Sequence, residues 1–241
     1  MLYIIGLGLN ERGISKEGLE AVSKCKKIYL ENYTVDFPYT EYQLEEIIGK
    51  KVKIANREKV EDLSLVDEAQ KLNVALLVYG APLSATTHIT LINECRASGI
   101  KYRTIYAASV FDAVAETGLQ LYKFGKTASM PKWQKSFEPE SFMEIVKENK
   151  KIDAHSLILV DIGLEFKDAL KQLKIAAKNQ EIKIEKLVVC QALGTRNQKI
   201  LFRSLEEVET FSGVQKPYCI ILPGKLHFLE KETLESFSGK R

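Results

Sequence analysis

The sequence has few of the residues that hold metal ions or form disulfides. Its 241 residues include four cysteines and three histidines. No CxxC, HxxxH or HExxH motif occurs, so the ligand spacing of a zinc site is absent. Each cysteine lies in or beside an apolar stretch, which predicts buried thiols in a reducing cytosol. We therefore expect neither a metal centre nor a disulfide framework.

Long apolar runs and an excess of charge of one sign are also missing. No run approaches the roughly 20 apolar residues that span a bilayer. The opening MLYIIGLGLNERG has no basic region before its apolar residues, so we expect no signal peptide. Lys and Arg total 35 against 32 Asp and Glu, a net charge of +3, which is too balanced for nucleic-acid binding driven by bulk charge. These absences predict a cytoplasmic protein with neither a membrane nor a nucleic acid as direct partner.

The first half of the chain alternates between short apolar runs and segments of helical spacing. Strands that alternate with helices of about ten residues indicate a parallel sheet with crossover helices. The run from Val74 to Val78 is apolar throughout, as expected for a strand buried on both faces. We expect strands at Leu2–Ile5, Lys27–Leu30, Val52–Ile54, Val74–Val78 and Tyr102–Ile105, and helices at Ser15–Cys25, Glu41–Ile48, Leu63–Lys71 and His88–Ser98.

The second half has a different order of elements. We expect helices at Ser109–Thr117, Pro139–Asn149 and Phe166–Asn179, and strands at Leu157–Asp161, Leu187–Cys190, Ile200–Arg203 and Tyr218–Leu222. The segment between the strands that end at Cys190 and begin at Ile200 is too short for a helix, which favours a mixed or antiparallel sheet. The predicted fold class is therefore α/β with two domains, 1–108 and 109–241: a parallel sheet in the first and a mixed sheet in the second.

Four loops of small residues follow predicted strands. They are Gly6–Leu9, Tyr79–His88, Tyr106–Val110 and Pro223–His227. Open α/β sheets bind ligands at the carboxyl ends of strands, and glycine lets the backbone approach a ligand closely. We expect the loops to converge on one cleft between the domains.

Each loop also fits a plainer interpretation when taken alone. A dinucleotide fingerprint needs a third glycine where Glu11 stands, so Gly6–Leu9 fits a tight turn equally well. Thr86 or Thr87 could cap the next helix. The loops contain no nucleophile–base pair, paired carboxylates or P-loop, which favours chemistry based on positioning over hydrolysis.

Several of these motifs together resemble the diphthine synthases, which belong to the tetrapyrrole methylase class. The motifs are GLGL at 6–9, ATTH at 85–88, TGLQLYKFGK at 117–126 and PGKLH at 223–227, and the resemblance spans nearly the whole chain. It implies two α/β domains with S-adenosyl-L-methionine between them and S-adenosyl-L-homocysteine as product. It also implies a homodimer, and translation elongation factor two as the protein substrate. A modified histidine of that factor is methylated repeatedly on its amino nitrogen; archaeal members stop at the trimethylammonium form, and eukaryotic members also esterify the carboxylate.

Carried over motif by motif, the resemblance implies a set of cofactor contacts. They are Leu9, Ala81, Ser84, Ser109, Val110, Val160, Leu193 and His227. We assign no catalytic acid or base, because an amine attacks a sulfonium methyl directly and a cleft of low dielectric lowers the pKa of the amine. His227 could act as a base or contact the adenosine.

The sequence departs from the family at three places. Ala81 stands where the family has aspartate, Tyr106 stands where it has histidine, and the segment after Asp161 is shorter. The first departure leaves cofactor affinity open, and the last leaves substrate docking open. Two alternatives follow: a catalytically weakened relative, and a methyltransferase of the same class acting on a tetrapyrrole-like ring. TGLQLYKFGK argues against the second.

Overall fold

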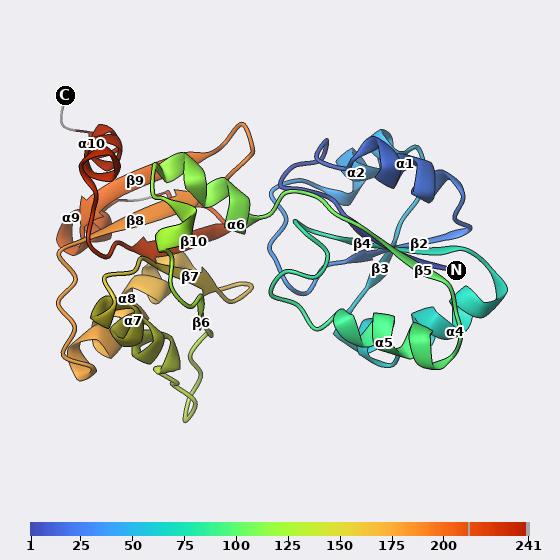
Figure 1. Ribbon diagram of the computed structural model, residues 1–241, viewed down its shortest axis with the longest axis horizontal. Coiled ribbons are helices and arrows are strands. Elements are labelled where there is room, and N and C mark those ends of the chain that lie inside the picture. The colour runs from blue at the N-terminus through green and yellow to red at the C-terminus, as the bar shows by residue number, and fades with distance from the viewer. Residues whose placement is uncertain (212, 240–241) are drawn as a thin grey trace. The chain divides into compact units, whose positions relative to one another are not determined.

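Each half of the chain builds its own sheet and its own core. The computed structural model describes residues 1–211 and 213–239. The chain divides into two compact units, Met1–Phe111 (unit 1) and Asp112–Arg241 (unit 2). Figure 1 labels most of the elements of both.

Unit 1 is a parallel sheet with helices on both faces. Its strands are β1 (Leu2–Gly6), β2 (Lys27–Glu31), β3 (Lys53–Ala55), β4 (Val74–Val78) and β5 (Tyr102–Ile105). Its helices are α1 (Lys16–Ser23), α2 (Glu41–Ile48), α3 (Arg57–Glu61), α4 (Ser64–Lys71) and α5 (Ile89–Ala97), and α6 (Val110–Ala113) contains the boundary between the two units. The strand order is β3-β2-β4-β1-β5, and every pairing among these strands is parallel. The predicted parallel sheet with crossover helices is confirmed.

The buried strand β4 explains why unit 1 needs helices on both faces. Leu76 of this strand joins the core that contains residues of α4 and α5, whereas Leu77 joins the core that contains residues of α1 and α2. This alternation follows from the two-residue period of a strand. In Figure 1, α1 and α2 cover one face of the sheet, and α4 and α5 cover the other. A strand without a polar face therefore has no exposed side.

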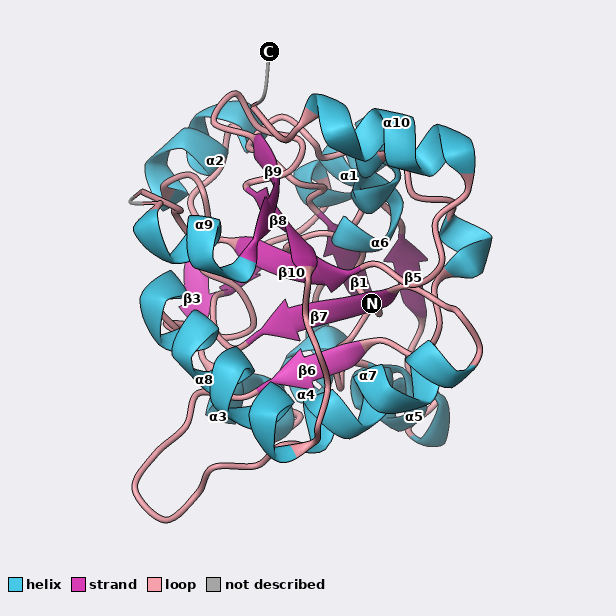
Figure 2. Cartoon of the chain, turned by 90° about the vertical axis from the view of Figure 1, so that its left-hand side faces the viewer, coloured by secondary structure: helices cyan, strands magenta, loops and turns pink. Residues whose placement is uncertain are grey.

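Unit 2 is a mixed sheet. Its strands are β6 (Ala128–Met130), β7 (Ser156–Val160), β8 (Lys186–Gln191), β9 (Lys199–Ser204) and β10 (Tyr218–Leu222). Its helices are η1 (Val114–Thr117), η2 (Leu121–Lys123), α7 (Ser141–Lys151), α8 (Phe166–Asn179), α9 (Leu205–Thr210) and α10 (Phe228–Ser236), where η marks a 3-10 helix. The order is β6-β7-β10-β8-β9, with β6 parallel to β7 and the other pairs antiparallel. Figure 2 shows this sheet with α7 and α8 beside it. The predicted mixed sheet is confirmed.

Some elements differ from the expectation. The helix expected at Ser109–Thr117 is α6 followed by the 3-10 helix η1. The expected threonine cap is wrong, because α5 has His88 as its N-cap and no side-chain cap bond. The short strand β6 and the helices α3, α9 and α10 were not expected. A strand of three residues is too short to show a period, and the first turn of α10 exposes Phe228 and Leu229, which obscures its amphipathic pattern.

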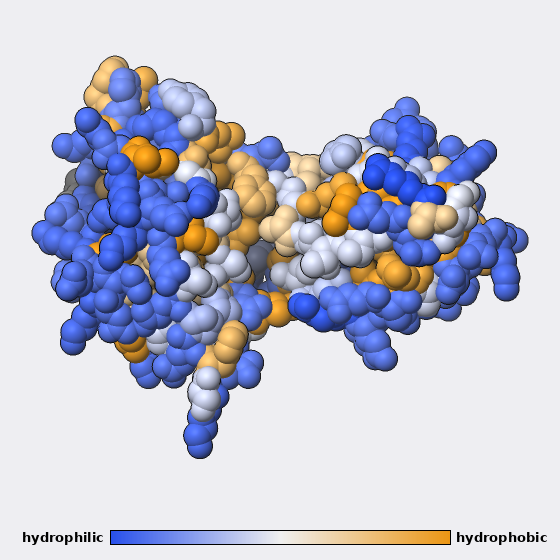
Figure 3. Space-filling model, turned by 60° about the horizontal axis from the view of Figure 1, so that its bottom comes forward, coloured by the Kyte–Doolittle hydropathy of each residue, from blue (hydrophilic) through white to orange (hydrophobic). Residues whose placement is uncertain are grey.

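No helix among the described residues is long and apolar enough to cross a membrane. On the face that Figure 3 shows, apolar residues form separate groups among hydrophilic ones.

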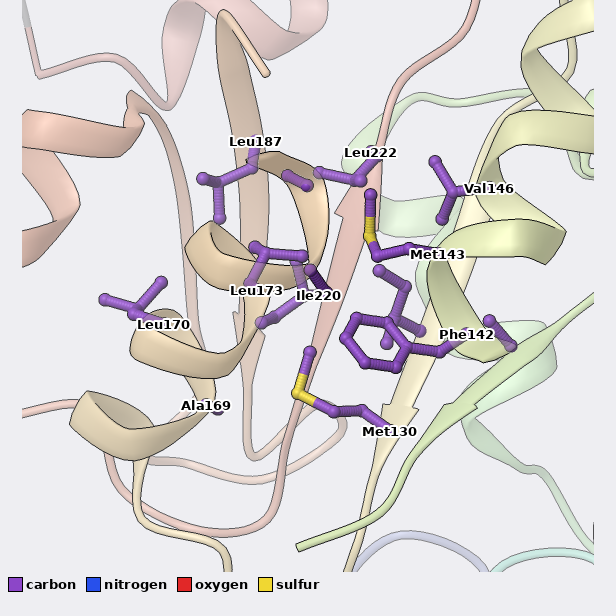
Figure 4. Packing of buried hydrophobic residues seen from close by; sticks show 14 of the residues in the cluster. Met130, Phe142, Met143, Val146, Ala169, Leu170, Leu173, Leu187, Ile220 and Leu222 are labelled. Atoms are coloured by element: carbon purple, nitrogen blue, oxygen red, sulfur yellow. The ribbon is translucent and has the colours of Figure 1, made fainter. Parts of the chain in front are cut away.

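The core of unit 2 lies between its sheet and the helices α7 and α8. Phe142 and Met143 of α7 and Leu173 of α8 pack with Ile220 of β10 (Figure 4). Phe142 is the largest side chain that is fully buried. Its removal would therefore leave a cavity that the surrounding side chains cannot fill.

We predict that Phe142→Ala lowers the free energy of unfolding by about 3–5 kcal/mol, because it loses both the buried ring and the packing around it. The control is Phe137→Ala, whose ring is 58% exposed in the same unit. That change should stay within about 0.5 kcal/mol. Urea denaturation of both variants checks the difference, and equal losses would contradict this placement of the core.

Candidate functional site

The carboxyl ends of β1, β4 and β5 gather three of the four predicted loops. These strands are neighbours in the parallel sheet of unit 1, so the loops that follow them leave the same edge. The predicted site residues on this edge are Leu9, Ala81, Ser84, Ser109 and Val110. These residues are up to about a hundred positions apart in the sequence, and the parallel pairing of the three strands brings them to one edge of the sheet.

Glycines lie where the three loops meet. The amide of Gly80 donates to the carbonyl of Gly8 at 2.9 Å, and the amide of Gly8 donates to the carbonyl of Gly80 at 3.3 Å. A Cβ added to Gly6 would lie 2.6 Å from the oxygen of Gly80 and 3.0 Å from the Cβ of Ala107. A side chain at Gly6 would therefore push apart the loops that follow β4 and β5. Gly6 ends β1 and Gly8 bridges to Gly80, whereas the hydrogen-bonded turn comes after this segment, where the amide of Gly13 donates to the carbonyl of Asn10 at 3.0 Å. The tight-turn interpretation of Gly6–Leu9 is therefore wrong.

Further bonds fix the loops that carry the predicted residues. The hydroxyl of Tyr79 donates to the carbonyl of Leu9 at 3.0 Å. The amide of Ser84 donates to the carbonyl of Ala81 at 3.2 Å, which closes a turn. His88 of the ATTH motif is fully buried, with Nδ1 3.1 Å from the carbonyl oxygen of Pro82. The buried ring of His88 therefore contacts the backbone of the loop and is not a surface group.

Glu31 ends β2, where a dinucleotide-binding fold places the acid that binds a ribose, and its carboxylate is already engaged. Its buried carboxylate accepts from the amides of Tyr33 and Thr34 and from the hydroxyl of Thr34. These bonds fold the loop after β2 back on itself. Beside that loop lies a hollow of about 350 Å³, lined by Tyr33, Thr34, Arg57, Ala85, Thr86 and Thr87. Glu31 is thus a structural residue of this loop.

The predicted residues of unit 2 do not share one edge of its sheet. Strands β7 and β8 both run antiparallel to β10. Val160 ends β7 and Leu193 follows β8, so these two lie at the same edge, whereas His227 follows β10 at the opposite edge. Leu222 of β10 pairs with Ser156 at the start of β7, which puts the two edges roughly 13 Å apart. A ligand that touches both Val160 and His227 must therefore extend along the strands.

His227 lies on the rim of a pocket in unit 2. The pocket has a volume of about 480 Å³ and is lined by Tyr122, Lys123, Phe124, Ile152, Asp153, Ala154, Lys225, Leu226 and His227. Most of these residues come from the TGLQLYKFGK and PGKLH motifs. The two motifs are about a hundred residues apart in the chain, and the fold brings them to one surface.

A buried carboxylate beside this pocket was missed by sequence reasoning. Glu230 is completely buried and accepts from the ammonium of Lys123, the amide of Gln120 at 3.0 Å, the amide of His227 at 2.7 Å and Nε2 of His155 at 3.1 Å. Burial opposes its ionisation, but the hydrogen bonds from these donors lower the pKa of Glu230 to about 2. Glu230 is therefore a carboxylate at neutral pH.

The ring of His155 is neutral in this arrangement. The amide of Gly224 donates to Nδ1 at 2.9 Å, which leaves the ring proton on Nε2, directed at Glu230. Burial lowers the pKa of His155 and outweighs the opposing effect of the Glu230 carboxylate. In the sequence Glu230 reads as an ordinary helical glutamate. Its partner His227 is three residues away, but the other partners are 75 to 110 residues away in the chain. No local signal could have identified it.

Known proteins resemble this chain over nearly its full length. A family model described as "Tetrapyrrole (Corrin/Porphyrin) Methylases" matches residues 1–209. The diphthine synthase of Methanocaldococcus jannaschii is 35% identical, and the alignment covers 98% of this chain and 98% of that protein. The diphthine methyl ester synthase of Homo sapiens is 36% identical, with 99% and 95% covered. A crystal structure of a diphthine synthase matches with a TM-score of 0.89 at 32% identity, covering 98% of this chain and 95% of that one.

Proposed function

Because the chain belongs to the tetrapyrrole methylase family and, within it, to the diphthine synthases, we propose that it methylates the amino group of a modified histidine in translation elongation factor two. The observation that carries this proposal is the identity of 35% to an archaeal diphthine synthase over 98% of both chains. Such coverage includes both units, and relatives named for diphthine synthesis favour this substrate over a tetrapyrrole ring.

The chain is an S-adenosylmethionine-dependent methyltransferase. When bound, that cofactor supplies an electrophilic methyl group. The residues at the carboxyl edge of unit 1 suit such a ligand in their chemistry. Leu9 and Val110 offer apolar contact, Ser84 and Ser109 offer hydroxyls, and small side chains leave backbone groups close to the surface. We propose these residues, with Ala81, Val160, Leu193 and His227, as the cofactor contacts.

The chain's task in the reaction is positioning. Its residues must hold the acceptor amine in line with the methyl group at about 3–3.5 Å, and good alignment supplies roughly 7–11 kcal/mol of the barrier. The amine must also be neutral, and an apolar surrounding lowers the pKa of an amine without a dedicated base. The proposal therefore requires no catalytic acid or base. Because elongation factor two is the proposed substrate, we also propose that the protein acts in the cytoplasm.

Isotope transfer tests the proposed function. With S-adenosylmethionine labelled in the methyl group, we expect label in elongation factor two that carries the aminocarboxypropyl histidine, and none in factor whose histidine is unmodified. An N-methyl group survives mild alkali and a methyl ester does not, so label stable to alkali identifies the amine as the acceptor. Mass spectrometry of the labelled peptide then counts the methyl groups.

Other outcomes contradict the proposal in separate ways. Label lost in alkali would identify a methyl ester. Transfer to a tetrapyrrole but not to the factor would overturn the assigned substrate. Cofactor binding without transfer to either acceptor would identify a relative that has lost turnover.

We predict that Ala81→Asp tightens S-adenosylmethionine binding, because it restores the acid of the family at a half-buried position. A charge-assisted hydrogen bond is worth about 1.5–3 kcal/mol, which corresponds to roughly 10- to 150-fold in affinity. Calorimetric titration measures the change. Ser84→Ala and Tyr106→Phe are the controls, since either side chain could already replace the missing acid.

Compensation by Ser84 or Tyr106 would make Ala81→Asp neutral or harmful, since the new carboxylate would lack a partner. In that case one of the two control variants should weaken binding. If Ala81→Asp, Ser84→Ala and Tyr106→Phe all bind like the native protein, this loop does not contact the charged end of the cofactor.

We also propose a homodimer. In TGLQLYKFGK, Leu119 is buried in its own unit, but Leu121 and Tyr122 are 45% and 83% exposed. In the first turn of α10, Phe228 and Leu229 are 69% and 52% exposed. The bond from the amide of Gln120 to Glu230 joins the two segments, so the exposed side chains belong to neighbouring elements. Exposed apolar groups of this kind favour association.

Light scattering at micromolar concentration should therefore give twice the mass of the chain. Tyr122→Glu should shift the protein toward the monomer, because a charge would be buried in the contact. The matched control is Tyr42→Glu, at an exposed tyrosine of α2 in unit 1, which should leave the mass unchanged. A monomeric native protein would contradict the proposed dimer.

A further inference from the structure

We infer that Glu230, acting with His155 and Lys123, is a positioning residue that holds the loop Pro223–His227 in the shape that binds the cofactor. This inference rests on the proposed function, which assigns His227 to the cofactor site. Glu230 is fully buried, so it cannot touch a ligand itself. Its effect must pass through the groups that it holds.

The cluster takes part in three hydrogen bonds of the loop backbone, and a fourth bond runs from the amide of Lys225 to the carbonyl of Asp153 at 3.2 Å. The loop joins β10 to α10 and belongs to neither a strand nor a helix. The amide of Gly224 donates to Nδ1 of His155, and the amide of His227 donates to Glu230. The carbonyl of Lys225 accepts from the ammonium of Lys123 at 2.8 Å. Gly224, Lys225 and His227 of the loop are therefore all bonded to the same cluster of His155, Lys123 and Glu230.

The cluster works as a unit because each member engages another. Lys123 bridges the carboxylate of Glu230 and the carbonyl of Lys225. His155 accepts from the loop on one ring nitrogen and donates to Glu230 through the other. Removing the carboxylate would leave buried donors without partners, which is unfavourable enough to rearrange the loop.

Close packing adds a second constraint. A Cβ on Gly224 would lie 2.4 Å from the carbonyl oxygen of Asp153 and 2.5 Å from that of Ala154. The backbone of the loop at Gly224 thus packs directly against the segment that leads into β7. Asp153, Ala154, Lys225 and His227 also line the 480 Å³ pocket, together with Lys123 of the cluster. The position of the loop consequently sets the shape of that pocket.

Glu230→Gln keeps the size of the side chain and removes its charge. We expect it to weaken S-adenosylmethionine binding about tenfold in calorimetric titration. The same change made in a His227→Ala protein should weaken binding less than twofold, because the group through which Glu230 acts is already gone. The control is Glu235→Gln, at an ion-paired glutamate of the same helix, which should leave affinity unchanged.

Two outcomes overturn different statements. A merely structural role for Glu230 would lower affinity equally in both backgrounds, and that result would refute the positioning inference while leaving the proposed function intact. If His227→Ala binds the cofactor like the native protein, His227 is not a cofactor contact, and the inference falls with that assignment. Methyl transfer to elongation factor two, measured on the same proteins, reports on the proposed function separately.

Two substitutions of His155 keep the inference testable if Glu230→Gln does not fold. The amide of asparagine can place its oxygen near the position of Nδ1, and that of glutamine can place its nitrogen near Nε2. His155→Asn keeps an acceptor for Gly224, so we expect affinity within about threefold of native. His155→Gln keeps the bond to Glu230 but loses the acceptor for the amide of Gly224, so we expect about tenfold weaker binding. Equal or reversed effects would contradict the inference.

Discussion

The parallel pairing of β1 with β4 and β5 is the constraint on which the site of unit 1 depends. A parallel ladder leaves no freedom in where the following loops emerge: they all leave the carboxyl edge. Two hydrogen bonds between Gly8 and Gly80 form an isolated antiparallel bridge just beyond the parallel strands. At Gly6 the loop after β5 also comes close. The carboxyl edge of this sheet is therefore held together largely by backbone contacts.

In unit 2 the loop after β10 is held in place in a different way. Its mixed sheet sends β10 against β7 and β8, so the loop after β10 emerges away from Val160 and Leu193. The amide of Lys225 bonds this loop to the carbonyl of Asp153, in the segment before β7. The buried carboxylate of Glu230 adds a second attachment, which has no counterpart in the contacts described for unit 1. Charge-assisted bonds suit this role, because they are strong and fixed in direction when water is excluded.

Much of the fold could be predicted from local sequence patterns, but most of the arrangement around His227 and Glu230 could not. The apolar run at Val74–Val78 and the helix at Phe166–Asn179 were expected with the bounds that the structure has. The first is a continuous apolar run, the second has a clear helical period, and both have clear ends. By contrast, the position of His227 opposite Val160 depends on strand direction, which no short window of sequence encodes. The bonds from Gln120, Lys123 and His155 to Glu230 join residues 75 to 110 positions apart, beyond any local signal.

The resemblance to known enzymes and the contacts in the structure therefore give different information about the site. Motif matching singled out His227 without a reason for its position, whereas the structure supplies the reason in a neutral His155 and an ionised Glu230. The neutral ring is essential to this arrangement, since a proton on Nδ1 would displace the amide of Gly224. The ionised carboxylate is essential as well, since its donors converge on negative charge. The protonation states of two buried groups thus fix the shape of a loop whose exposed end is the proposed cofactor contact.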